Sequence, residues 1–94
     1  MGLVSFDAVE AEPIAANGVV KKGPGALFGF IVVASSSGNI AFYDNTAASG
    51  TPLIPQRAVA AGDIVTFGGF GVKFNTGLYF NLVSGTATVR PLYR

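Results

Sequence analysis

The chain of 94 residues contains no cysteine, histidine or tryptophan. It therefore lacks the usual side-chain ligands of transition metals and the Ser-His and Cys-His pairs of many hydrolases. Disulfide bonds are excluded as well, and small domains without them often gain stability by forming oligomers. These absences predict a protein that is not an enzyme and that holds no cofactor.

Charged side chains are scarce. Six Lys or Arg and five Asp or Glu make up 12% of the chain and give a net charge of +1, whereas an average soluble domain is about 25% charged. The electrostatic field of so small a net positive charge is too weak to attract a phosphate backbone, so we expect no nucleic-acid partner. With 50% apolar residues and little repulsion between copies, the composition favours a protein partner and a homo-oligomer.

Five carboxylates remain as candidates for acid–base chemistry. A glycoside hydrolase would place two of them about 5 to 10 Å apart around a sugar, and the sequence alone leaves that pairing open. The local pattern favours a simpler role, because Asp44 precedes a loop and Asp63 follows Gly62 in a predicted turn, where Asp commonly binds backbone groups. The acidic residues near the N-terminus lack the spacing of a calcium loop. The five are Asp7, Glu10, Glu12, Asp44 and Asp63.

Long apolar segments are missing too. No stretch approaches the roughly 18 apolar residues of a membrane-spanning helix, and residues 1–7 lack the basic and apolar regions of a cleaved signal. We expect no membrane partner. Residues 1–12 combine Leu3, Val4 and Phe6 with an acidic stretch, and we predict that they form an N-terminal arm that contacts a neighbouring subunit.

Glycine and proline, by contrast, are plentiful. The 13 glycines and five prolines interrupt every window that could hold a long helix. Between them lie short runs rich in Val, Ile, Phe, Tyr and Thr, the composition of β-strands. We predict a single all-β domain over residues 1–94, with about eight short strands at the spacing of a sandwich or barrel.

Two hairpins stand out in this pattern. Residues 26–34 form the most apolar run, with apolar side chains on both faces, which predicts a central strand covered on both sides. Residues 35–39 read as a turn that leads into a strand at 40–44. The second predicted hairpin joins strands at 78–83 and 86–93 through Ser84 and Gly85.

Proline and alternation refine the placement of two further strands. Pro55 lacks a backbone N–H, so we predict that residues 53–59 lie at a sheet edge, and Pro91 likewise indicates an edge or a bulge. In the last strand one face should be buried, and the residues between its members should be partly exposed to solvent. The buried face consists of Ala87, Val89, Pro91 and Tyr93.

The three tyrosines are candidate interface residues. Tyr43, Tyr79 and Tyr93 each carry a hydroxyl on an aromatic ring, which suits half-exposed positions or a subunit interface better than Phe does. The alternative is a stacking platform for sugars, a role that more often uses tryptophan.

The C-terminal sequence resembles the end of many small bacteriophage virion proteins, which close with a similar pattern of Gly-Leu-Tyr, Ser-Gly-Thr-Ala-Thr-Val and Tyr. Residues 23–27, 37–45 and 60–63 fit the same pattern in the same order, so the resemblance covers residues 19–94. The matching C-terminal residues are Gly77-Leu78-Tyr79, Ser84-Gly85-Thr86-Ala87-Thr88-Val89 and Tyr93.

The resemblance implies an antiparallel β-sandwich of jelly-roll type that is a structural part of a phage particle. We expect a capsid decoration or cement protein, made in the host cytoplasm, that binds the major capsid protein on the capsid surface, with a homotrimer as the favoured oligomer. The alternative is a carbohydrate-binding or adsorption module of a fibre or tail.

Overall fold

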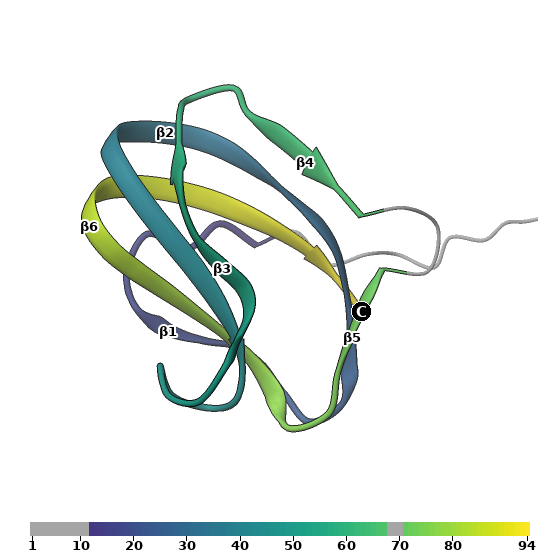
Figure 1. Ribbon diagram of the computed structural model, residues 1–94. Coiled ribbons are helices and arrows are strands. Elements are labelled where there is room, and N and C mark those ends of the chain that lie inside the picture. Colours follow the sequence, from purple (N-terminus) through teal and green to yellow (C-terminus); the bar gives the residue numbers. More distant parts are fainter. Residues whose placement is uncertain (1–11, 68–70) are drawn as a thin grey trace, which may run out of the picture.

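The computed structural model describes residues 12–67 and 71–94, and this part of the chain is all-β (Figure 1). The first of the short strands that the composition predicts, at residues 3–8, lies outside the described residues. No described segment is a helix, so none is a helix long and apolar enough to cross a membrane. The strands are β1 (Gly18–Lys22), β2 (Gly25–Asp44), β3 (Pro52–Val59), β4 (Ile64–Thr66), β5 (Val72–Phe74) and β6 (Gly77–Tyr93).

One long antiparallel ribbon organises the sheet. β2 has 20 residues and β6 has 17, and they pair from Leu27 opposite Tyr93 to Asp44 opposite Leu78. β1 pairs with the outer edge of β6, and β3, β4 and β5 all pair with β2. Figure 1 shows that the ribbon of β2 and β6 bends sharply and folds back, which divides it into a first half near the C-terminus and a second half near β1 and β3.

The bend lies where the sequence predicts turns. Ser37 and Gly85 both have positive φ angles, 54° and 70°, and the register between the two strands shifts between Ser36 and Asn39. A Cβ atom on Gly85 would collide with the carbonyl oxygen of Ser37, so only glycine permits the two backbones to approach this closely. The turn-forming residues therefore produce a bulge that bends two paired strands together.

Both predicted hairpins are wrong for this reason. Residues 35–39 stay within β2, and Ser84 and Gly85 stay within β6. The two strands of the first predicted hairpin are the two halves of β2, and those of the second are the two halves of β6. The described residues contain six strands. The edge position of the segment with Pro55 is confirmed, because β3 ends the sheet order.

Pro91 marks the end of a second small ladder. Ile14 exchanges two backbone hydrogen bonds with Val89, of 2.8 and 2.9 Å. Two residues after Val89, Pro91 is the next position in β6 whose backbone would bond to the chain segment of Ile14. Proline has no N–H to continue this pairing. Within the described residues neither β1 nor Ile14 pairs with Pro91, which agrees with the predicted edge or bulge.

The core lies between the two halves of the ribbon. Phe30 of the first half contacts Phe42 of the second, with ring centroids 5.6 Å apart, and Phe42 contacts Phe80 at 5.5 Å. The predicted alternation of the last strand is confirmed, because Ala87, Val89, Pro91 and Tyr93 are buried. The largest fully buried side chains are Phe30, Phe42, Phe74, Phe80, Leu27, Ile40, Leu78, Val32, Val89 and Pro91.

The prediction that residues 26–34 are covered on both sides is wrong. Val33 is 51% exposed, and Phe28 is only half-buried. The pairing register shifts between Leu27 and Gly29, and this irregularity reverses the alternation, so that Phe28 does not face the core with Phe30. β2 is central in the hydrogen-bonded sheet, but its first half has an open outer face.

Candidate interaction surfaces

An aliphatic face covers the outer side of the first half of the ribbon. Ile31 of β2 lies directly opposite both Ile64 of β4 and Arg90 of β6, and side chains in directly opposed positions share a face of the sheet. Ile64 is 68% exposed and Val33, two residues beyond Ile31, is 51% exposed. We call Ile31, Val33 and Ile64 the aliphatic face.

A tyrosine row crosses the outer side of the second half. Tyr79 of β6 pairs with Val19 of β1 on one side and with Tyr43 of β2 on the other, and Tyr43 pairs with Pro52 of β3. The neighbours Phe42 and Phe80 are fully buried, so the alternation directs Tyr43 and Tyr79 to the outside. Both tyrosines are half-buried and Val19 is 37% exposed. The tyrosine row is Val19, Tyr79, Tyr43 and Pro52.

Ala41 and Asn81 extend this surface by one further pair. They lie opposite each other, two residues from Tyr43 and Tyr79 respectively, and so face the same way. Ala41 is only 2% exposed although it is not part of the core cluster. Ala41 is therefore covered by neighbouring atoms although the alternation directs it to the outer side.

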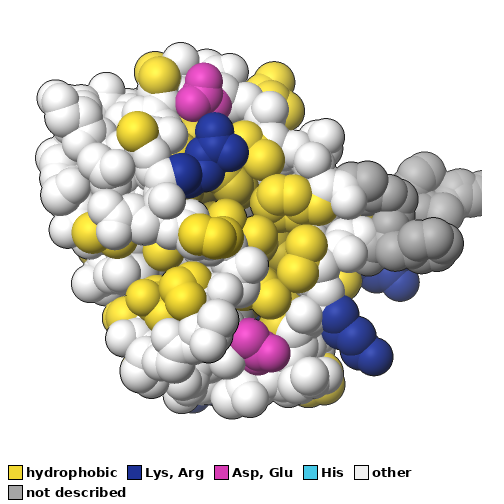
Figure 2. Space-filling model, viewed as in Figure 1, with side chains coloured by type: hydrophobic (Ala, Val, Ile, Leu, Met, Phe, Trp, Pro, Cys, Tyr) yellow, Lys and Arg dark blue, Asp and Glu magenta, His cyan; other side chains and the backbone are white. Residues whose placement is uncertain are grey.

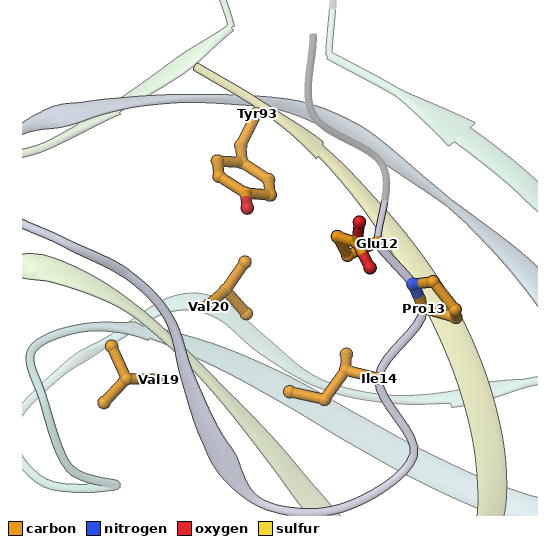
Figure 3. A pocket seen from close by; sticks show the side chains of 6 residues that line it. All are labelled: Glu12, Pro13, Ile14, Val19, Val20 and Tyr93. Carbon is orange, nitrogen blue, oxygen red and sulfur yellow. The ribbon is translucent and has the colours of Figure 1, made fainter.

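Tyr93 does not join the other two tyrosines. It is 8% exposed and belongs to the core cluster, so the predicted half-exposed position is wrong for this residue. Tyr93 and Val20 point toward each other across a pocket of about 220 Å³ at the edge of the fold (Figure 3). The pocket is lined by Glu12, Pro13, Ile14, Val19, Val20 and Tyr93.

The other predicted interface residues, Leu3, Val4 and Phe6, lie outside the described residues. The sequence reasoning did not single out Ile64 or Val33 as interface residues. Their exposure depends on the pairing of Ile64 with Ile31 and on a further register shift of β2 against β6 between Val32 and Ala34. A signal for Ile64 was present, because it directly follows the turn at residues 61–63 and alternates with Val65, which packs against the core.

Arg90, opposite Ile31, is the charged neighbour of the aliphatic face, whereas the residues of the tyrosine row are uncharged. On the side of the molecule seen in Figure 2, a few charged groups lie around an apolar region between β3 and β4. The guanidinium carbon of Arg57 lies 6.0 Å from the centre of the Phe30 ring, where it covers the edge of the core. Within residues 12–67 and 71–94 no three Asp or Glu side chains gather where they could hold a metal ion.

The two loop carboxylates have structural roles. Asp63 accepts a hydrogen bond of 2.9 Å from the backbone N–H of Ala60 in its own turn, as predicted. Asp44 instead binds a distant turn, where it accepts backbone N–H groups from Asn75, Thr76 and Gly77 at 2.8 to 3.4 Å. Burial raises the pKa of Asp44, but these donors outweigh it and hold the pKa below the ordinary 3.8. The purely local role predicted for Asp44 is wrong.

Comparison with known proteins finds no family model, no curated protein and no solved structure that matches this chain.

Proposed function

We propose that the chain is a non-enzymatic structural protein of a bacteriophage particle, a capsid decoration or cement protein that binds the major capsid protein. The observation that carries the proposal is the aliphatic face. Ile64 at 68% and Val33 at 51% exposure stand on the open side of a paired sheet, where a group of exposed apolar side chains gains stability when a partner covers it. Assignment to a phage particle, on the capsid surface, rests on the sequence resemblance over residues 19–94.

The finer architecture is part of the same proposal. The contact of Phe30 with Phe42 across the folded ribbon supports a two-layered sandwich of jelly-roll type, because two sheets that pack face to face share one core between them. The half-sheets would be the two halves of the β2–β6 ribbon, extended by β4 and β5 in one layer and by β1 and β3 in the other.

Self-association follows from the same surface chemistry. With a net charge of +1, neighbouring copies repel each other little. We favour a homotrimer, in which Leu3, Val4 and Phe6 of residues 1–12 contact a neighbour. Light scattering on the full chain and on a chain without residues 1–12 tests this. A full-length monomer at high concentration would contradict self-assembly, and unchanged assembly of the shortened chain would contradict the role of the arm.

Binding to capsids that lack this chain tests the decoration role. In a co-sedimentation assay Ile64→Ser should weaken binding about tenfold, which corresponds to about 1.4 kcal/mol, a typical loss for one apolar side chain in an interface. Thr66→Ser, at the next outward position of β4, is the matched control and should bind normally. Normal capsid binding by a folded Ile64→Ser chain would assign the aliphatic face another role.

A further inference from the structure

The tyrosine row has a different chemistry from the aliphatic face. It places two aromatic rings on adjacent strands, Tyr43 directly opposite Tyr79, with the amide of Asn81 two residues from Tyr79 on the same side. Sugar binding by stacking needs exposed aromatic rings with nearby polar partners, and the separate predicted strands did not show whether any tyrosines would meet. The fold brings two of the three together.

We infer that the tyrosine row binds a neutral carbohydrate, with Tyr43 and Tyr79 as the stacking residues and Asn81 as a polar partner. A sugar ring has an apolar C–H face, which packs on aromatic rings, and hydroxyl groups at its rim, which need hydrogen bonds. The row and the adjoining pair supply both features, since an aromatic surface stands beside an amide that can donate and accept.

The available hydrogen-bonding capacity supports this role. Within residues 12–67 and 71–94 the side chain of Asn81 makes no hydrogen bond, whereas Asn39 donates to Ser84 at 3.2 Å and Asn17 accepts from the backbone of Leu82 at 2.6 Å. Asn81 is the asparagine beside the tyrosines, and its amide can serve a ligand without breaking a contact that supports the fold.

The exposure of the rings and the lack of charge decide the class of ligand. Tyr43 and Tyr79 are half-buried, so each ring keeps part of its surface open to a ligand. None of the six side chains is charged, so the surface offers no counter-ion to a phosphate or a carboxylate. A neutral sugar fits better than a nucleotide or an acidic glycan. The six are Val19, Tyr79, Tyr43, Pro52, Ala41 and Asn81.

An array of oligosaccharides, neutral and acidic, probed with the full chain, tests the inference. We expect binding to neutral members built of glucose, galactose, mannose or N-acetylglucosamine. For a bound member, NMR titration should give shift changes centred on Tyr43, Tyr79 and Asn81. Absence of binding across the array, binding to acidic members alone, or shift changes centred on another surface would each overturn the inference.

Variants separate stacking from other contacts. Tyr79→Ser should weaken binding of the neutral oligosaccharide about tenfold, whereas Tyr79→Phe, which keeps the ring, should stay within about threefold of the parent. Ile64→Ser lies on the other outer face and should bind the sugar normally, so the sugar site and the proposed capsid contact can fail independently. Unchanged sugar binding by folded Tyr43→Ser and Tyr79→Ser chains would overturn the assignment. If a variant does not fold, the NMR map of the parent chain decides.

Discussion

The ring of Phe30 lies 5.6 Å from the ring of Phe42, centre to centre, although both residues belong to the single strand β2. A straight strand rises about 3.3 Å per residue, so two of its residues this far apart in sequence cannot touch unless the strand folds back. The bulge at Ser37 and Gly85 makes that possible. Stability and surface exposure both depend on this bend.

The close approach at the bend predicts a large effect of Gly85→Ala. The new Cβ would meet the backbone carbonyl of Ser37, which cannot rotate away, and φ at this position is 70°. We expect a loss of about 3 kcal/mol or more in the free energy of unfolding, measured with urea. Gly50→Ala is the control, since Gly50 has φ 82° with no atom near its added Cβ, and should lose about 1 kcal/mol. Equal losses would show that the close approach is unimportant.

The two phenylalanines near the start of β2 should respond differently to truncation. Phe30 is fully buried, and Phe30→Ala should destabilise the fold by about 3 to 5 kcal/mol, since it leaves a cavity between the two halves. Phe28 is half-buried on the other side of the irregularity, and Phe28→Ala should cost less than about 2 kcal/mol. Thermal and urea unfolding measure both, and a reversed order would contradict the shifted alternation.

Asp44 should give the fold a specific dependence on acid. Its folded-state pKa lies below the ordinary 3.8 because of its backbone donors. The charged carboxylate therefore stabilises the fold fully at pH values above 3.8. This stability is lost as the pH falls through the folded-state pKa. Urea midpoints measured from neutral pH down to strongly acidic pH should show the loss. Asp44→Asn should remove this part of the slope, and Glu12→Gln, a charge-matched change at an exposed residue, should leave it in place.

Asn17 should stabilise the end of β1 through its side-chain oxygen. Its Oδ1 accepts the N–H of Leu82 at 2.6 Å, just past the last backbone pair of β1 with β6. Asn17→Ala leaves that N–H without a protein partner and should cost about 1 kcal/mol. Asn17→Asp keeps an oxygen acceptor and should retain most of the stability. Hydrogen exchange at the Leu82 amide reports the contact directly, and unchanged protection in Asn17→Ala would refute it.

Part of the candidate site followed from the sequence. Tyr43 and Tyr79 could be chosen from their chemistry, and alternation with buried Phe42 and Phe80 puts them on an outer face. That they are direct partners follows from the register of β2 with β6, which depends on a ribbon that the predicted hairpins would have divided. Tyr93 carries the same chemistry, but inward alternation in β6 buries it.

The sequence by itself determined that this protein is all-β and poor in charge, that it has no cysteine or histidine chemistry, and where its backbone departs from straight strands. Those properties are local, because glycine, proline and the β-branched residues act through their own φ and ψ angles. Only the tertiary structure decided whether Ser37 and Gly85 reverse the chain or bend it. Local geometry permits both outcomes, and the bend is selected because β2 and β6 remain paired through it and enclose Phe30, Phe42 and Phe80 between their two halves.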